Sequence, residues 1–267
     1  MWPACWGQGS SLPGLARRAG RDKPCPYKKT GTDFTMIPIR IVLVRPRNPN
    51  NIGAAARAMK NFGFTDLIVV SPQSSIWEEA RAAVGAEDIL ERARVYDTLA
   101  EAVSDCALVI GTADLRRGEG LAPSSLREQL IRSNGPAALV FGSEKTGLTN
   151  ADLNFCHRIL TIPTCTDFPS MNLGQAVAVC CYELGRGEST TLPLQPANDY
   201  ATIGELEGLL GQSVEILKDV GFLSEQNVQS MTEELRRSLL RLRPTSREVT
   251  VWRGALRQIA WRLGSGG

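Results

Sequence analysis

Three polar segments of the chain carry side chains that could bind and orient a polar ligand. These side chains are Asn51 and Arg57 in the first segment, Glu144 in the second, and Ser170 and Asn172 in the third. Each segment follows a short apolar run, and open α/β sheets form their ligand sites at the carboxyl ends of strands. A guanidinium suits bidentate binding of phosphate, and a carboxylate accepts hydrogen bonds from hydroxyl groups. We therefore predict an enzyme.

The second segment, residues 142–149, contains glycines and a Lys-Thr pair and could be mistaken for a nucleotide phosphate-binding loop. A Walker A loop has glycine immediately before the lysine, and here that position holds Glu144. A carboxylate would also repel phosphate. No Gly-x-Gly-x-x-Gly motif follows a strand-like run either, so neither of these nucleotide-binding motifs is predicted.

Composition narrows the class of protein. The 267 residues are 43% hydrophobic, which predicts a buried core, and the formal net charge of +2 is too small to indicate a nucleic-acid binder by itself. A polyanionic partner would have to meet a local patch of basic residues. No apolar run approaches ~18 residues, so we expect no transmembrane helix.

The cysteines and the single histidine predict neither a metal site nor disulfides. Seven cysteines include no Cys-x-x-Cys pair, which favours buried free thiols in a reducing, cytoplasmic compartment. His157 is the one histidine, too few for a His-rich metal site. We interpret it as a structural residue and expect no metal.

Five β-rich runs alternate with amphipathic stretches, which predicts an α/β fold with a parallel, doubly wound sheet. The runs are Ile39–Val44, Leu67–Val70, Ala107–Gly111, Ala137–Phe141 and Arg158–Ile162. The first helix is expected to be capped by Asn51, to continue through an alanine-rich run, and to stop at Gly63.

Changes in composition predict four parts of the chain. They are a disordered N-terminal extension over residues 1–36, an α/β domain over 37–186, a linker over 187–201, and a helical C-terminal module over 202–267. The linker interval contains two prolines and has no periodicity.

The C-terminal module carries two helix start signals and many arginines. Thr202 with Glu205, and Thr245 with Glu248, are capping-box patterns that precede apolar residues at helical spacing. The arginines expected on its helical faces are Arg236, Arg237, Arg241, Arg243, Arg247, Arg253, Arg257 and Arg262. They indicate either a solvated face or a surface that contacts RNA.

The three segments resemble, in order, the three motifs of the SpoU/TrmH family of RNA ribose 2′-O-methyltransferases in the SPOUT superfamily. The matching features are Asn51-x5-Arg57, the Phe-Gly-Ser-Glu-Lys-x-Gly-Leu loop at 141–148, and Ile162-Pro163 followed by Ser170-Met171-Asn172-Leu173. Arg45-Pro46-Arg47-Asn48-Pro49, Gly147-Leu148-Thr149-Asn150 and the stretch 256–263 look like the TrmJ type. That type methylates the 2′-hydroxyl of nucleotide 32 in the tRNA anticodon loop.

The resemblance implies the α/β-knot fold, with a deep C-terminal trefoil knot that binds S-adenosyl-L-methionine, and a homodimer acting on tRNA. For catalysis and ribose handling it implies Asn51, Arg57, Glu144, Ser170 and Asn172. For cofactor binding it implies Thr112, Ala113, Asp114, Gly142, Ile162, Pro169, Ser170 and Met171.

One loop departs from the family pattern. The family usually has Gly-Thr-Ser-Ala-Arg where this chain has Gly-Thr-Ala-Asp-Leu at 111–115, followed by Arg116 and Arg117. The sequence therefore leaves open which contacts this loop makes with substrate or cofactor.

Two alternatives also stay open. One is methylation of ribosomal RNA or of another tRNA position, because the motif residues handle ribose and backbone and not bases. The other is a non-catalytic RNA-binding protein of the same fold. Intact Arg57, Glu144 and Asn172 argue against the second alternative.

Overall fold

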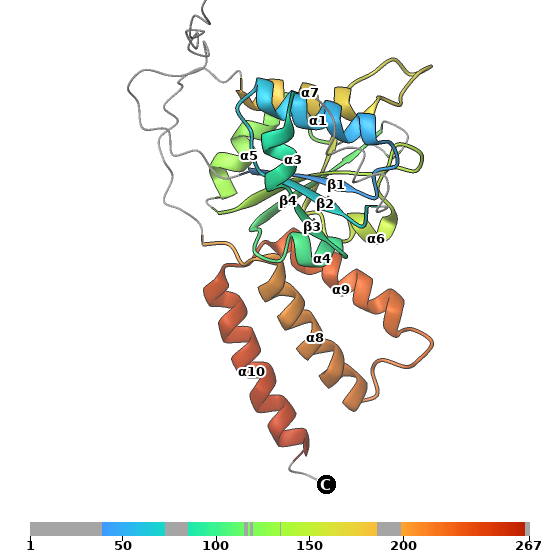
Figure 1. Ribbon diagram of the computed structural model, residues 1–267. Helices are drawn as coiled ribbons and strands as arrows, with labels where there is room; N and C mark the ends of the chain where they lie inside the picture. The colour runs from blue at the N-terminus through green and yellow to red at the C-terminus, as the bar shows by residue number, and fades with distance from the viewer. Residues whose placement is uncertain are drawn as a thin grey trace, which may run out of the picture. The chain divides into compact units, whose positions relative to one another are not determined.

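Six parallel strands form one sheet in the computed structural model, which describes residues 39–72, 85–114, 117, 120–133, 135–185 and 199–264 (Figure 1). In chain order the strands are β1 (Ile39–Val44), β2 (Leu67–Val70), β3 (Arg94–Tyr96), β4 (Leu108–Ala113), β5 (Ala137–Phe141) and β6 (Arg158–Thr161). Their order across the sheet is β3-β2-β1-β5-β4-β6, and every pairing is parallel. The predicted parallel sheet is confirmed, and β3 is an additional edge strand.

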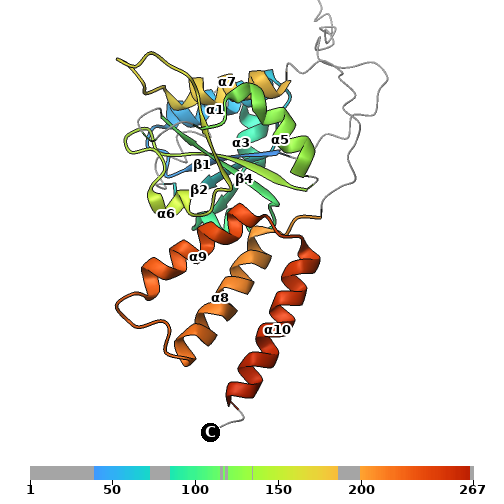
Figure 2. The same ribbon diagram turned by 180° about the vertical axis from the view of Figure 1, so that it is seen from behind.

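Helices cover both faces of the sheet, as Figures 1 and 2 show. On one face lie α1 (Pro49–Asn61), α3 (Glu87–Arg92), α5 (Leu126–Ser133) and α7 (Leu173–Gly185), with the short 3-10 helix η2 (Pro123–Ser125) preceding α5. On the other lie α4 (Leu99–Ala102) and α6 (Asn150–Leu153). Ile41 and Leu43 point to the first face, and Val42 and Val44 to the second. This two-sided burial explains why the strands read as continuous apolar runs.

Helix α1 begins one turn earlier than the sequence analysis predicted. Asn48 is the N-cap, and its side chain accepts a hydrogen bond from the backbone N–H of Asn50, while Pro49 occupies the first helical position. The prediction that Asn51 caps the helix is therefore wrong, because Asn51 lies inside the first turn. The expected stop is confirmed, since Gly63 follows the helix with a φ of 82°.

Helices α1 and α7 pack closely against one another. A Cβ atom placed on Gly174 would lie 2.6 Å from the Cβ of Ala54, so glycine is needed where the two helices cross. This packing brings the start of α7 beside the first turn of α1.

Three helices follow the α/β sheet: α8 (Ile203–Asp219), α9 (Val228–Leu242) and α10 (Ser246–Gly264). Both predicted capping boxes are present, at Thr202 with Glu205 and at Thr245 with Glu248. The start of α8 is tied to the sheet domain, because the backbone N–H of Ile203 donates to the carbonyl of Cys106 at 3.0 Å. The predicted extension over 1–36 lies outside the described residues, as does most of the predicted linker.

The arginines of these helices divide into two groups. Arg236 donates to Glu207 at 2.7 and 2.9 Å, and Arg243 stacks over the ring of Tyr200 at 4.2 Å. These two side chains therefore serve packing between helices and loops. The other six predicted arginines, at 237, 241, 247, 253, 257 and 262, are exposed.

The buried thiols and the histidine are structural. Cys106, Cys180 and Cys181 are buried and free, and burial raises the pKa of Cys106 to about 12. His157 is also buried, and its Nδ1 accepts the backbone N–H of Val109 at 3.1 Å. Burial, with the nearby charges of Arg243 and Arg158, lowers the pKa of His157 to about 3. The imidazole is therefore neutral and holds β4.

Candidate active site

A cavity of about 340 Å³ opens at the carboxyl ends of β4, β5 and β6. Its lining includes every residue that the sequence resemblance assigned to the cofactor: Thr112, Ala113, Asp114, Gly142, Ile162, Pro169, Ser170 and Met171. The residues come from the end of β4 and from the loops after β4, β5 and β6, which are distant in sequence. Parallel strands bring these loops together because their carboxyl ends lie at one edge of the sheet.

The loop after β5 doubles back on itself at the cavity wall. The backbone N–H of Gly147 donates to the carbonyl of Ser143 at 2.7 Å, and Gly147 has a φ of 65°. A Cβ on Gly142 would lie 2.1 Å from the carbonyl carbon of Gly147, a separation that a side chain cannot occupy. The two glycines thus allow a tight turn that presents Glu144 beyond the strand.

Glu144, Asn51 and Asn172 form a continuous hydrogen-bonded network. The Glu144 carboxylate accepts the Asn51 side-chain amide at 2.9 Å, and the Asn51 carbonyl oxygen accepts the Asn172 amide at 2.8 Å. The same carboxylate accepts the backbone N–H groups of Arg47 at 2.9 Å and Asn48 at 3.1 Å. The structure therefore brings together three of the five predicted catalytic residues, one from each motif.

The network also fixes the start of α7. The Asn172 side-chain oxygen accepts the backbone N–H of Gly174 at 2.9 Å, which satisfies a free donor of the first turn. Ser170 is exposed and lines the cavity two residues before Asn172. Its neighbour Met171 also lines the cavity, while the Asn172 amide contacts Asn51 and the start of α7.

Arg57 takes no part in the hydrogen-bonded network. It is exposed on α1 and does not line the cavity. Its Nε lies 3.8 Å from the position that a Cβ on Gly85 would take. Within the described ranges, its guanidinium makes no hydrogen bond or ion pair.

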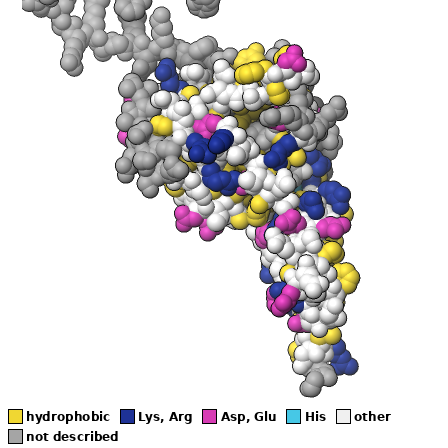
Figure 3. All heavy atoms as spheres, turned by 90° about the vertical axis from the view of Figure 1, so that its right-hand side faces the viewer, with side chains coloured by type: hydrophobic (Ala, Val, Ile, Leu, Met, Phe, Trp, Pro, Cys, Tyr) yellow, Lys and Arg dark blue, Asp and Glu magenta, His cyan; other side chains and the backbone are white. Residues whose placement is uncertain are grey.

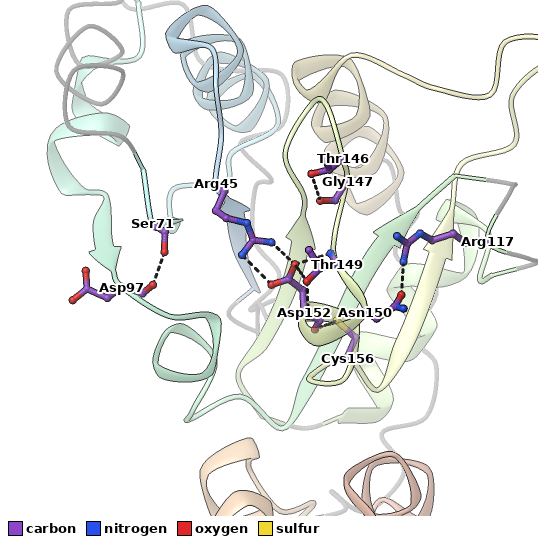
Figure 4. A network of polar contacts seen from close by, with 10 residues as sticks. All are labelled: Arg45, Ser71, Asp97, Arg117, Thr146, Gly147, Thr149, Asn150, Asp152 and Cys156. Atoms are coloured by element: carbon purple, nitrogen blue, oxygen red, sulfur yellow. Dashed lines mark hydrogen bonds and ion pairs between the residues drawn. The ribbon is translucent and has the colours of Figure 1, made fainter. Parts of the chain in front are cut away.

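A partly buried ion pair joins the segment after β1 to helix α6, and the sequence analysis did not find it. Arg45, at the end of β1, binds the carboxylate of Asp152 in α6, as Figure 4 shows. Asp152 and Thr149 form a capping box at the start of α6. Burial alone would raise the pKa of Asp152, but the hydrogen bonds from Arg45 and Thr149 lower it. The Thr-x-x-Asp spacing was the signal available in the sequence.

Further polar side chains line the cavity that the sequence analysis did not assign to the site. They are Arg117, Ser143, Lys145, Thr146 and Thr164. Arg117 donates to the side chain of Asn150 at 3.1 Å and lies just after the loop that departs from the family pattern (Figure 4). An arginine that follows that loop thus lines the cavity.

Two other classes of site can be assessed in the part of the chain that the structure describes. There, no group of three or more His, Cys, Asp or Glu side chains is placed to hold a metal ion. None of the described helices combines the length and apolarity that a membrane span requires.

Family profiles match nearly the whole of the described chain. The SpoU rRNA Methylase family profile matches residues 38–182, and the profile of the C-terminal domain of tRNA methyltransferase TrmJ matches residues 204–266.

Individual relatives agree with the profiles. The tRNA (cytidine/uridine-2′-O-)-methyltransferase TrmJ of Salmonella typhimurium is 37% identical over 232 residues, which cover 83% of this chain and 96% of that protein. The crystal structure of TrmJ from Z. mobilis superposes with a TM-score of 0.72 at 33% identity, covering 84% of this chain and 99% of that one. The chain therefore belongs to the SpoU methylase family, with a C-terminal segment of the TrmJ type.

Proposed function

We propose that the protein is an S-adenosyl-L-methionine-dependent tRNA ribose 2′-O-methyltransferase. The observation that carries the proposal is the Glu144–Asn51–Asn172 network at the rim of the strand-end cavity. The network links all three motif segments, and relatives aligned over most of this chain are named as tRNA 2′-O-methyltransferases. Family membership further supports the knotted form of the fold.

The cavity fits S-adenosyl-L-methionine. Its volume of about 340 Å³ lies within the range of small-molecule sites, roughly 300–1,000 Å³. Phe141, Leu160 and Ile162 provide apolar walls, while Asp114 and Arg117 provide opposite charges. The cofactor carries both charges too, in its sulfonium and ammonium groups and its carboxylate. When bound, it supplies an electrophilic methyl group.

The residues around the cavity orient the ribose and handle its proton. Methyl transfer would require the ribose 2′-hydroxyl to face the cavity and to lose its proton, which would pass to Arg57 in the alternative role given below or to solvent. Ser170 and Asn172 can hold the hydroxyl at the cavity edge, and correct orientation contributes roughly 7–11 kcal/mol. No metal is required for this displacement.

Arg57 has the role of binding phosphate and stabilising the developing alkoxide. A guanidinium carries its positive charge at neutral pH and therefore suits electrostatic stabilisation. Transient action as a base is the alternative role, and it would need a dry interface between RNA and protein.

Arg57 is proposed to act on the partner subunit's cavity in a homodimer. Its exposure, and its absence from the cavity of its own chain, favour this arrangement. Asn51 differs, because it already contacts Glu144 and Asn172 within one chain. Mixing Arg57→Ala with Asn172→Ala subunits should restore part of the activity through sites with both residues intact. A fully active monomer would contradict the shared site.

The proposed target is nucleotide 32 of the tRNA anticodon loop, in the cytoplasm. The C-terminal helices support a tRNA target because six of their arginines are exposed. Mapping 2′-O-methyl groups in total RNA with and without the gene tests the target. Loss of the mark at nucleotide 32 is expected. Loss at a ribosomal position or another tRNA position would assign that target, and no loss would favour a non-catalytic RNA-binding protein.

A further inference from the structure

A second hollow, of about 320 Å³, lies beside the cavity. Its lining residues are Arg45, Pro46, Arg47, Ser71, Ser143 and Thr146. Ser143 and Thr146 also line the cavity, so the two spaces lie on either side of the loop after β5. Apart from these two residues, the hollow shares no lining residue with the cavity, and it contains none of the residues that the resemblance assigned to the cofactor.

The backbone at this hollow is held in an uncommon conformation. Arg45 and Ser71 have φ values of 49° and 47°, and they follow the neighbouring strands β1 and β2. Non-glycine residues with positive φ cost free energy and gather at functional sites. Figure 4 shows Arg45, Ser71 and Thr146 on three separate loops at this edge of the sheet.

All the side chains that line the hollow except that of Pro46 carry hydrogen-bond donors, and Arg47 supplies its positive charge. The charge of Arg45 is neutralised by Asp152, and the Ser71 hydroxyl donates to the carbonyl of Asp97. Within the ranges that the structure describes, the Arg47 side chain makes no hydrogen bond or ion pair. The Thr146 hydroxyl already donates to the carbonyl of Gly147 at 3.5 Å, which leaves the Arg47 guanidinium and the Ser143 hydroxyl as donors for an anion with several oxygens.

The hollow is coupled to the catalytic network through the backbone of the same residue. The N–H of Arg47 donates to Glu144 at 2.9 Å, while its side chain lines the hollow. An anion bound there would lie next to the residues that orient the ribose. In RNA, the anions adjoining a ribose are its own two flanking phosphates. Basic side chains also gather on the face of the sheet domain seen in Figure 3.

We propose that this hollow binds one of the two phosphates that flank the ribose to be methylated, with Arg47 as the positioning residue. The inference rests on the proposed function, since it assumes an RNA substrate in the adjoining site. Binding the phosphate fixes the ribose against the cavity and carries no sequence information.

The test uses the full-length protein and three variants: Arg47→Ala, Arg47→Lys and, as a matched loss of one exposed charge, Arg92→Ala. Replacing the Arg47 side chain keeps the backbone N–H that donates to Glu144. Arg47→Ala should weaken tRNA binding roughly tenfold, as expected for a charge-assisted hydrogen bond. It should also reduce the slope of log K against log salt by about 0.7–0.9. Arg47→Lys should keep the slope, and Arg92→Ala should match wild type in affinity.

A second measurement identifies the phosphate. RNA hairpins carry a neutral methylphosphonate at either linkage flanking the nucleotide that the wild-type enzyme methylates. The nucleotide 5′ to each neutral linkage is a 2′-deoxynucleotide, which prevents strand cleavage, and the reference hairpin carries the same deoxynucleotide with an ordinary phosphate. At one of the two linkages, the methylphosphonate should weaken binding of the hairpin to wild type and leave its binding to Arg47→Ala unchanged. Equal weakening of both proteins at both linkages, or wild-type tRNA affinity for Arg47→Ala, would overturn the inference.

These outcomes are separate from the test of the proposed function. If wild type methylates tRNA and Arg47→Ala binds tRNA as tightly as wild type does, the phosphate site is refuted and the proposed function stands. Wild type that binds cofactor and transfers no methyl group to any RNA would refute the proposed function.

Discussion

Replacing Gly142 with alanine should disrupt the cavity, while the same change at Gly147 should be tolerated. A Cβ on Gly142 would lie 2.1 Å from the carbonyl carbon of Gly147 and 2.2 Å from the backbone nitrogen of Leu148, whereas ordinary contacts are 3.4–4 Å. Both neighbours are backbone atoms that cannot rotate away. The two segments must therefore separate by more than ~1 Å, which breaks the 2.7 Å hydrogen bond from Gly147 to Ser143.

The expected cost follows from this overlap. Overpacking that side chains can absorb costs about 1–3 kcal/mol, so a backbone clash should cost at least ~3 kcal/mol. For a chain of this size that corresponds to a fall in Tm of about 6 °C or more. At Gly147 no atom lies within 4 Å of an added Cβ, and only the φ of 65° is unfavourable. That conformation costs about 1–2 kcal/mol in alanine.

Thermal unfolding and calorimetric titration with S-adenosylmethionine measure both effects. Gly142→Ala should lose cofactor affinity by at least tenfold, because the displaced loop forms a cavity wall. Gly147→Ala should keep binding within a few-fold of wild type. A Gly142→Ala protein with wild-type Tm and wild-type cofactor affinity would refute the close approach of the two segments.

Three further substitutions test other parts of the site. Arg57→Ala should abolish methyl transfer with little change in Tm or cofactor affinity, since the side chain is exposed. Arg57→Lys should also transfer methyl groups slowly, because an ammonium lacks the planar fork of a guanidinium. Near-normal turnover by the lysine variant would exclude bidentate binding. Glu144→Gln should lower kcat at least tenfold with a stability change of only ~1 kcal/mol. The amide replaces one acceptor oxygen by a nitrogen that only donates, so the three donors to Glu144 cannot all keep a partner. An unchanged kcat would show that the network does not orient the ribose. Wild type should lose stability as the pH falls from 6.5 toward 3, by up to ~1.4 kcal/mol per pH unit, because the folded-state pKa of His157 is lowered to about 3. In His157→Asn the free energy of unfolding should no longer show this dependence on pH between pH 6.5 and 5. The same dependence in both proteins would contradict a buried neutral imidazole.

Local sequence predicted the central strands well and the sheet edge poorly. The predicted bounds of β1, β2 and β5 match the structure because these strands are buried on both faces and consist of continuous apolar residues. Strand β3 has only three residues, of which Arg94 and Val95 are exposed, so it has no apolar pattern to detect. It forms because β2 offers a free edge.

The N-cap of α1 could have been predicted correctly from the sequence. Pro49 favours the first helical position, which places the cap on the preceding residue, Asn48. Asn51 was assigned the cap from its side-chain type alone. Its position inside the first turn leaves both ends of its amide free for Glu144 and Asn172.

The residue types of the site could be read from the sequence, but their contacts could not. Glu144 lies 93 residues from Asn51, and Asn172 lies 121 residues from Asn51. These contacts depend on the order in which β1, β5, β4 and β6 lie across the sheet, and no local pattern encodes that order. The pairing of Arg45 with Asp152 and the hollow around Arg47 depend on the same order.

The most direct test is methyl transfer by the purified protein to unmodified tRNA, with S-adenosylmethionine labelled in its methyl group and a chelator present. Nuclease digestion and mass spectrometry locate the label. The proposed function predicts one labelled 2′-O-methylnucleoside per tRNA, in the anticodon loop, and none with Asn172→Ala. Label on a base, label that requires a divalent ion, or equal labelling by Asn172→Ala would contradict it.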